Sequence, residues 1–307
     1  MLKNYVRIAR IDHWFKNIFM LPGVGLGILM TDPVLGNALW NASIALLSTS
    51  LIASANYVIN EWLDAEFDRH HPVKQVRPSA SGKIEAKYVY LEYAFLVIAG
   101  LGLAFLLSSL FLALSVFLLV MGILYNVRPF RTKDRVYLDV ISESINNPIR
   151  LLLGWSAVTT YVVLPPSSII LTYWMGGAFL MAVKRYAEYR FIDDPKKAAL
   201  YRRSFKYYNE QTLLLSALFY ALSSSFFLGI FLVKYRIEFL LSFPLFALLF
   251  VWYLAIGMKP HSPTQNPEKL YRETGFIAYL IFLCIVVAGL FVVDLPWLEI
   301  FVEKQEF

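Results

Sequence analysis

The sequence has almost no cysteine and few charged residues. Cys284 is the single cysteine among 307 residues, and it lies in an apolar run. One cysteine excludes intramolecular disulfides and thiolate metal clusters, so we expect no redox chemistry. Charged residues make up only 16% of the chain. Long polar stretches with an amphipathic periodicity of their own are also missing, so we expect no separate extramembrane domain.

Apolar residues dominate instead. Hydrophobic residues make up 58% of the chain, above the roughly 45–50% that is usual in soluble domains. They gather in segments of roughly 20 residues, the length that crosses about 30 Å of hydrocarbon. We therefore predict an all-α fold, a polytopic membrane helical bundle forming a single domain over residues 1–307. About nine spans are predicted, at about 15–31, 38–60, 88–108, 110–127, 137–161, 168–189, 210–232, 238–258 and 275–294.

Basic residues gather between alternate spans. With the N-terminus inside, only Lys234, Arg236 and Lys304 fall outside, Arg150 lies within the fifth span, and every other Lys or Arg falls inside. This bias predicts a multi-pass protein of the cell membrane with its N-terminus and site loops in the cytoplasm. It also explains the net charge of +6 without a nucleic-acid partner. The N-terminal apolar stretch lacks a small-residue cleavage site, so we expect it to be kept as the first helix.

A stripe of oxygen ligands ends the second span. At about 100° per helical residue, Asn60, Asp64 and Asp68 share one helix face within an arc of roughly 80°. Two carboxylates and an amide oxygen suit Mg²⁺, which prefers hard oxygen ligands and bridges to substrate phosphates. A solvated helix end carrying ordinary acids is the alternative interpretation.

The next loop, at 69–83, is rich in cations and contains two prolines. Arg69, Lys74 and Arg77 are candidate phosphate ligands, and arginine offers bidentate geometry. Two adjacent histidines in this loop are more often solvated than metal-bound. Acidic ligands beside fixed cations are what a complex of diphosphate and Mg²⁺ requires.

This helix end and loop resemble the UbiA superfamily of intramembrane prenyltransferases. The family pattern N-D-x-x-D-x-x-x-D, followed by D-R-x-x-P-x-K-x-x-R-P-x-x-x-G, is matched by Asn60, Glu61, Asp64, Asp68, Arg69, Pro72, Lys74, Arg77, Pro78 and Gly82. Glu61 departs from the family, which has aspartate there. The resemblance implies a UbiA-like fold and Mg²⁺ as cofactor. It also implies that the metal ligands are Asn60, Glu61, Asp64 and Asp68, of which Asp64 and Asp68 are catalytic.

Other landmarks resemble the branch of decaprenyl-phosphate phosphoribosyltransferases. Trp14-Phe15-Lys16-Asn17 is similar to its Q-W-x-K-N element, Lys184-Arg185-Tyr186-Ala187-Glu188 is similar to G-K-R-x-x-E, and residues 201–208 are similar to R-x-S-L-x-x-Y. The likeness implies transfer of 5-phosphoribose from phosphoribosyl diphosphate to a polyprenyl phosphate in cell wall biosynthesis. The implied substrate-binding residues are Lys16, Lys184, Arg185 and Tyr186, and Glu188 is implied as catalytic.

The second motif leads with cations. Other prenyltransferases of the resembled family typically place a second aspartate-rich stripe here, whereas Asp193 and Asp194 lie beyond the expected helix end. Lys184 and Glu188 are spaced to pair on one helix face. Extra cations suit a substrate with both a phosphate and a diphosphate. Anchoring by the positive-inside bias is the alternative explanation for the cations of this region.

A polar stripe runs through the fifth span. Asp139, Glu143 and Asn147 recur every four residues, with Asn146 and Arg150 beside them. An arginine within a membrane costs roughly 2.5–3.5 kcal/mol unless it meets water or a partner. Two roles stay open for Arg150: a structural pair with an acid such as Glu143, or contact with the lipid phosphate.

Three functions are compatible with these patterns. Phosphoribosyl transfer is favoured, isoprenyl transfer from a prenyl diphosphate to an aromatic or lipid acceptor is the alternative, and transport without chemistry is the third. Transport is disfavoured because the polar residues gather at one membrane rim rather than at the midplane. No pattern in the sequence indicates the isoprenoid length or the oligomeric state.

Overall fold

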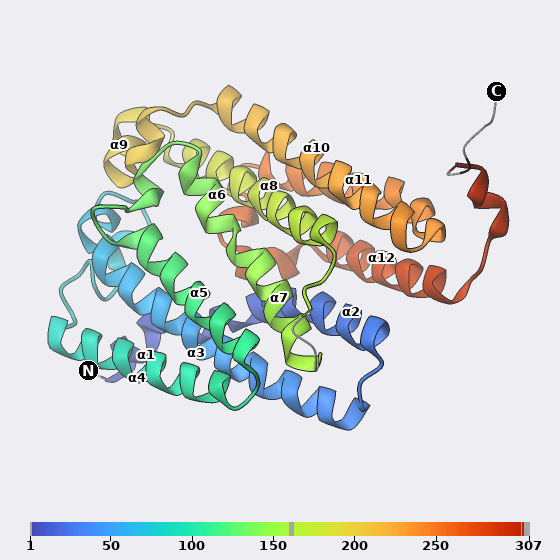
Figure 1. Cartoon of the computed structure of the whole chain (residues 1–307). Helices are drawn as coiled ribbons and strands as arrows, with labels where there is room; N and C mark the ends of the chain where they lie inside the picture. The colour runs from blue at the N-terminus through green and yellow to red at the C-terminus, as the bar shows by residue number, and fades with distance from the viewer. Residues whose placement is uncertain (1, 160–162, 302, 304–307) are drawn as a thin grey trace. The chain divides into compact units, whose positions relative to one another are not determined.

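The structure is a computed structural model that describes residues 2–159, 163–301 and 303. Every regular element within these ranges is a helix, so the predicted all-α class is confirmed (Figure 1). The chain divides into two compact units, Met1–Pro165 with Ile192–Thr212, and Pro166–Phe191 with Leu213–Phe307. The single domain over 1–307 stays a prediction.

The first unit contains eight α-helices and four 3-10 helices among its described residues. The α-helices are α1 (Leu2–Ile8), α2 (Leu21–Thr31), α3 (Leu35–Asp68), α4 (Ala86–Phe105), α5 (Ser109–Asn126), α6 (Leu138–Ser144), α7 (Asn146–Val158) and α9 (Pro195–Tyr201). The 3-10 helices are η1 (Ile11–Met20), η2 (Lys74–Val76), η3 (Thr132–Asp134) and η4 (Arg203–Lys206).

The second unit is built from long apolar helices. They are α8 (Ser167–Ile192), α10 (Glu210–Tyr235), α11 (Phe243–Gly257) and α12 (Thr274–Val292), and the shorter turns are η5 (Ile237–Ser242), η6 (Pro263–Gln265), η7 (Pro267–Arg272) and η8 (Pro296–Phe301). The first residues of α10 belong to the first unit.

The membrane spans follow the sequence prediction closely. Within the described ranges, eight helical segments are long and apolar enough to cross a bilayer, so the chain is a multi-pass membrane protein. The predicted span at 137–161 differs, because it is divided near Ile145 into α6 and α7, and its residues 160 and 161 lie outside the described part. The cell membrane and the cytoplasmic N-terminus stay predictions.

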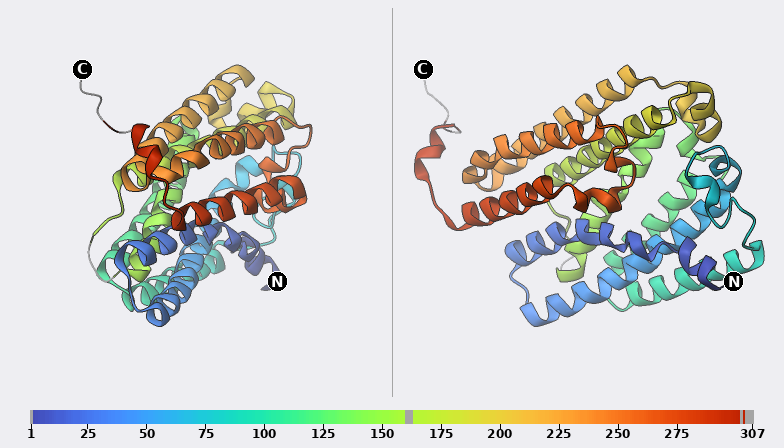
Figure 2. Two further views of the ribbon diagram at one scale, coloured as in Figure 1. Left: turned by 90° about the vertical axis from the view of Figure 1, so that its right-hand side faces the viewer. Right: turned by 180° about the vertical axis from the view of Figure 1, so that it is seen from behind.

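Helix α3 is the centre of the first unit. It packs against α4, α5 and α7, and Figure 2 shows it running alongside α4. Small residues allow this close approach: the hydroxyl of Ser48 donates to the carbonyl oxygen of Gly100 at 2.8 Å. With 34 residues, α3 is about 50 Å long, which exceeds the roughly 30 Å of hydrocarbon. Its last turns therefore extend to the membrane edge, where the polar motif lies.

Helices α2 and α7 touch backbone to backbone through two glycines. A Cβ at Gly154 would lie 2.1 Å from the carbonyl oxygen of Met20, and one at Gly23 would lie 2.0 Å from that of Leu151. We expect Gly154→Ala to lower the melting temperature of the purified protein, because overpacking costs about 1–3 kcal/mol. Gly102→Ala is the matched control, since a Cβ there meets no atom within 4 Å. Equal melting temperatures for the two variants would refute this contact.

Candidate functional site

Two aspartates at the end of α3 meet cations from the following loops. Oδ1 of Asp64 accepts hydrogen bonds from Nη2 of Arg131, at 2.8 Å, and from Nζ of Lys133. Oδ2 of Asp68 accepts a hydrogen bond from Nη1 of Arg77 at 2.7 Å. Both aspartates lie on one continuous helix, as the spacing in the sequence predicts.

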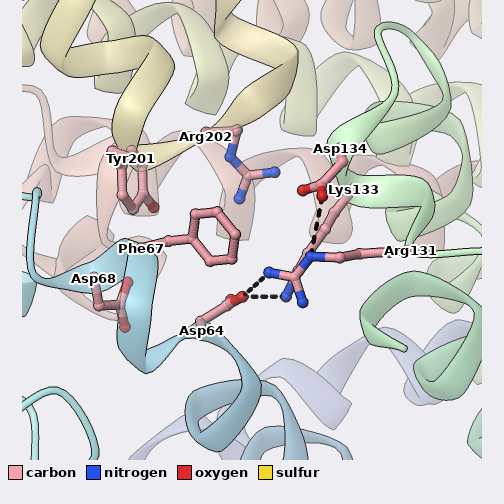
Figure 3. Close-up of a pocket in the computed structure, with 8 residues that line it drawn as sticks. All are labelled: Asp64, Phe67, Asp68, Arg131, Lys133, Asp134, Tyr201 and Arg202. Atoms are coloured by element: carbon pink, nitrogen blue, oxygen red, sulfur yellow. Dashed lines mark hydrogen bonds and ion pairs between the residues drawn. The ribbon is translucent and has the colours of Figure 1, made fainter. Parts of the chain in front are cut away.

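Both aspartates line a pocket of about 270 Å³, a volume that includes the solvent space at its mouth. Its lining combines three acids, three cations and two aromatic rings, all from the first unit: Asp64, Phe67, Asp68, Arg131, Lys133, Asp134, Tyr201 and Arg202 (Figure 3). Arg131 bridges two of the acids, since its Nε also donates to Oδ2 of Asp134 at 3.1 Å. The pocket therefore combines carboxylates with an equal number of cationic side chains.

Asn60 takes part in positioning a cation. Its amide donates to Oδ1 of Asn126, which also accepts from Nζ of Lys133 at 2.7 Å. Asn126 ends α5, and its carbonyl oxygen accepts from Nη1 of Arg131 at 2.9 Å. Asn60 is absent from the pocket lining, and its predicted role as a metal ligand stays a prediction.

Glu61, which stands where the family motif has aspartate, forms an ion pair with Arg10. Its Oε2 accepts from Nη2 of Arg10 at 2.9 Å, and its buried Oε1 has no hydrogen-bond partner among the residues that the structure describes. Glu61 also does not line the pocket. Its role as a metal ligand stays a prediction.

The three predicted phosphate ligands of the loop have different environments. Arg77 pairs with Asp68, whereas Nζ of Lys74 contacts the hydroxyl of Tyr201. Arg69 is exposed and its Nε donates to the carbonyl oxygen of Ala80 at 3.2 Å, which braces the loop. Arg77 and Lys74 therefore lie at the rim of the pocket, because their partners Asp68 and Tyr201 line it. The partner of Arg69, Ala80, does not line the pocket.

His71 shapes the same loop. Its Nδ1 accepts hydrogen bonds from the backbone N–H groups of Val73 and Lys74, at 3.1 and 3.2 Å. The ring also lies edge-on to Tyr201, with 4.6 Å between centroids. These contacts are those of a turn-forming residue.

The pKa values of Lys133 and Arg77, which come from the two loops beside the aspartates, shift in opposite directions. The pKa of Lys133 is lowered to about 8, because burial and the charge of Arg131 outweigh the opposing effect of Asp64. Burial also acts to lower the pKa of Arg77, but Asp68 and Glu61 outweigh it, and the pKa is raised above its ordinary value. Arg77 is therefore a permanent cation, whereas the charge of Lys133 depends on the anions beside it.

Sequence reasoning missed Arg131 and Lys133, which it assigned to the positive-inside bias. The available signal was their place after a polar helix end, since Asn126 closes α5. Tyr201 and Arg202 were noted within the resembling stretch at 201–208, and Arg202 was also assigned to the positive-inside bias. They reach the pocket from a segment that follows the second motif in the chain.

A buried aspartate anchors that segment. Asp139, fully buried in α6, accepts hydrogen bonds from the hydroxyls of Ser204, at 3.0 Å, and Tyr208, at 2.8 Å. Arg202 lies 3.8 Å from the same carboxylate. The polar stripe predicted in the fifth span thus holds the α9–η4 segment against α6, within the first unit.

The second motif belongs to the second unit. On α8, Nη1 of Arg185 lies 3.3 Å from Oε2 of Glu188, and the two side chains are 1% and 2% exposed. Lys184 is half-buried, and the buried Tyr186 accepts a hydrogen bond from Arg190. Their joint action with the α3 site stays a prediction.

Arg150 does not pair with Glu143. Its Nε donates to Oδ1 of Asn17 at 3.1 Å, and its Nη1 donates to the carbonyl oxygen of Asn146 at 3.3 Å. Glu143 accepts instead from the hydroxyl of Tyr125 at 2.7 Å. The structural pair considered for Arg150 is therefore not the one formed.

The donor set of the pocket fits Mg²⁺. Only one oxygen of each aspartate takes the contacts described above, which leaves Oδ2 of Asp64 and Oδ1 of Asp68 available among the described residues. No group of three or more His, Cys, Asp or Glu side chains in those residues would enclose an ion. Two carboxylates are consistent with the coordination preference of Mg²⁺, which usually keeps water molecules and substrate phosphates as its other ligands.

Comparison with known proteins points to one family. The model of the UbiA prenyltransferase family matches residues 20–286. A structure of a UbiA homolog from Archaeoglobus fulgidus, bound to GPP and Mg²⁺, superposes with a TM-score of 0.69 at 21% identity, and covers 91% of this chain and 99% of that one. The predicted UbiA-like fold is therefore confirmed.

Individual relatives differ in their reactions. A decaprenyl-phosphate phosphoribosyltransferase of Mycobacterium tuberculosis is 29% identical over 216 residues, which are 69% of this chain and 68% of that protein. Protoheme IX farnesyltransferase 2 of Bacillus subtilis is 29% identical over 166 residues, 52% of either chain. An uncharacterized protein of Sinorhizobium fredii, y4nM, is also 29% identical, and the match spans 50% of this chain but only 28% of that protein.

Proposed function

This chain belongs to the UbiA prenyltransferase family and is a membrane-embedded transferase, and from that premise we propose that it moves 5-phosphoribose from phosphoribosyl diphosphate to a polyprenyl phosphate. Diphosphate is the second product. We further propose that the reaction takes place at the cytoplasmic face of the cell membrane and serves cell wall biosynthesis, and that Mg²⁺ is the cofactor. The positive-inside bias supports the location.

The observation that carries the proposal is the charge of the second motif. Asp194 has a structural role, because it is the N-cap of α9 and its Oδ1 accepts from the backbone N–H of Lys196 at 2.9 Å. Helix α8, which precedes it in the chain, carries Lys184 and Arg185 about two turns before its end. A prenyl diphosphate needs no further phosphate site, whereas phosphoribosyl diphosphate carries a separate 5-phosphate that these cations suit.

The chemistry requires positioning and charge neutralisation. An ionised oxygen of the lipid phosphate attacks the anomeric carbon and forms the new C–O bond, while the bond from that carbon to the diphosphate breaks and diphosphate leaves with the electron pair. The nucleophile is already ionised, so no strong general base is needed. Fixed cations and dipoles at the leaving group are the main source of rate in such a step.

The residues of the pocket supply these charges. Arg131 and Lys133 pair with Asp64 in the structure, and in the complex they donate to diphosphate oxygens, as do Arg77 and Lys74 at the rim. Asp64 and Asp68 would hold Mg²⁺ through the carboxylate oxygens that take none of the hydrogen bonds described above. The ion, when bound, neutralises the departing diphosphate.

We propose separate roles for the residues of the second motif. Lys184 and Arg185 bind the 5-phosphate, and Glu188 orients the ribose hydroxyls. The buried pair of Arg185 with Glu188 fixes the arginine side chain in one geometry, which favours bidentate recognition of a phosphate. Tyr186 lies between Arg185 and Glu188 in the sequence and contacts the same substrate.

Isoprenyl transfer is the second candidate. It is favoured by the likeness to a farnesyltransferase over 52% of the chain and by the archaeal homolog, whose structure holds GPP and Mg²⁺. It would use the same aspartates of α3, so the donor is what separates the two reactions.

The experiment compares donors directly. Purified protein with Mg²⁺ and a polyprenyl phosphate receives either radiolabelled phosphoribosyl diphosphate or radiolabelled farnesyl diphosphate. We expect label from the first donor in the organic phase and a lipid that mass spectrometry shows to be heavier by one phosphoribose. Polyprenol, which has no phosphate, is the control acceptor and should stay unlabelled. Label that passes only from farnesyl diphosphate would overturn the proposal in favour of isoprenyl transfer.

A further inference from the structure

The chain leaves its last membrane helix, α12, through a turn that two charged side chains fix. Nε of Arg236 donates to the carbonyl oxygen of Leu290 at 3.0 Å, and its Nη2 donates to that of Val293 at 2.6 Å. Oε1 of Glu238 accepts from the backbone N–H of Leu295 at 3.1 Å, and Arg236 also pairs with Glu238 at 3.4 Å. These contacts satisfy carbonyl groups at the end of α12 and fix the place where the next helix, η8, begins.

The length of α12 places η8 at a surface of the membrane. Helix α12 has 19 residues and is therefore about 28 Å long, close to the roughly 30 Å of hydrocarbon. It begins directly after a polar segment in which the exposed Lys259 pairs with Glu273 at 2.7 Å, so this end lies at one polar boundary. Its other end, Val292, reaches the opposite boundary, and η8 begins shortly after it at Pro296. Figures 1 and 2 show η8 turning away from the axis of α12, so it does not continue the span.

The three faces of η8 differ in polarity. A 3-10 helix has three residues per turn, so residues three apart share a face. One face carries Trp297 and Ile300, which are 61% and 67% exposed. The second face carries Leu298, which is buried where η8 lies against η5, and then Phe301. The third face carries the exposed acid Glu299. Helix η8 therefore presents an apolar face and an acidic face side by side to its surroundings.

The apolar face continues the surface that α12 exposes along its span. Ile285 and Val292 are exposed apolar side chains of this membrane helix, and Trp297 follows at the boundary where the span ends. Tryptophan is enriched at this level of a bilayer, because its ring is apolar while its indole N–H donates to head groups or water. The carboxylate of Glu299 requires water, because burial of an unpaired charge is costly. The boundary of a bilayer supplies both environments within the width of one helix.

We infer that η8 lies in the surface of the bilayer beside α12, with the face of Trp297 and Ile300 in the acyl region just below the head groups and Glu299 in water. The partner is the lipid itself. No head-group charge is required, because apolar side chains make the contact. The turn held by Arg236 and Glu238 sets this orientation, and the embedded helix anchors the end of the second unit at the boundary. The inference is independent of the reaction that the protein catalyses.

Two adjacent labelling positions test this orientation. A nitroxide spin label is attached at Ile300→Cys or at Glu299→Cys in a Cys284→Ser background, which removes the single cysteine, and the full chain is placed in phosphatidylcholine nanodiscs. Power saturation compares accessibility to oxygen, which partitions into lipid, with accessibility to a water-soluble nickel chelate. We expect the ratio of oxygen to nickel accessibility to be several-fold higher for Ile300→Cys than for Glu299→Cys. The wild-type chain labelled at the exposed Cys284 of α12 gives the value for lipid, and Lys83→Cys in an exposed loop gives the value for water.

Tryptophan fluorescence tests the same segment without a label. The spectrum of Trp297→Phe is subtracted from that of the wild-type protein, which isolates the emission of Trp297. We expect phosphatidylcholine brominated near the top of its acyl chains to quench this difference signal, and aqueous iodide to leave it unchanged. Equal nickel accessibility of the two labels together with quenching by iodide would place η8 in water and overturn the inference. Low accessibility of the label at Ile300→Cys to both reagents, with dipolar broadening between labels, would show that a second copy covers this face and would also overturn it.

Discussion

Replacing Asp64 with asparagine is expected to lower kcat by about a thousandfold while the protein stays folded. The change removes one of the two carboxylates that we propose as Mg²⁺ ligands and frees the two cations that pair with it, Arg131 and Lys133. Loss of one preorganised electrostatic group costs roughly 10²–10³ in rate, and loss of a metal ligand acts on the same step. The measurement is single-turnover transfer of labelled phosphoribose to lipid, together with the elution profile on size exclusion.

Glu66→Gln is the matched control for this variant. Glu66 is an exposed acid on the same last turns of α3, two residues along the chain and therefore on the opposite face. It should keep normal turnover. Near-normal turnover of Asp64→Asn, or an equal loss in Glu66→Gln, would reject the assignment of Asp64.

Replacing Lys133 with methionine should lower kcat by about a hundredfold or more. Methionine fills a similar volume but removes a buried ammonium that contacts both Asp64 and Asn126. The charge of the departing diphosphate grows in the transition state, so the loss should appear in kcat more than in KM. Initial rates over a range of phosphoribosyl diphosphate concentrations separate the two.

Two further variants define the role of Lys133. Lys133→Arg keeps the charge and should recover part of the rate, whereas Lys83→Met removes an exposed loop lysine and should have no effect. If Lys133→Met instead raised KM with kcat unchanged, the ammonium would contribute to ground-state binding alone. Full activity of Lys133→Met would contradict the proposal that Lys133 contacts the departing diphosphate.

Much of the fold was accessible from local patterns. Runs of apolar residues locate membrane helices because lipid satisfies no backbone polar group, so each span must be a helix. The stripe of Asp64 and Asp68 was predictable for the same reason, since a helix continuing past the bilayer fixes which side chains share a face. The division near Ile145 was not predicted, because the polar stripe there reads as one helical period.

The partners of the aspartates were harder to predict. Arg131 and Lys133 follow α5 and are separated from Asp64 by 67 and 69 residues, and positive-inside anchoring explained them equally well. Only packing of α5 on α3 brings them to the site. The same holds for Arg150, whose contact with Asn17 spans 133 residues. Spacing within one element predicts a face, whereas contacts between elements depend on packing.

The central claim is that the end of α3 captures a divalent ion together with a diphosphate. The most direct measurement is a crystal structure of the protein with Mn²⁺ and phosphoribosyl diphosphate, recorded at a wavelength where manganese scatters anomalously. We expect an anomalous peak at roughly 2.2 Å from one oxygen each of Asp64 and Asp68, bridged to the diphosphate. Diphosphate bound with the anomalous peak remote from both aspartates would contradict the claim.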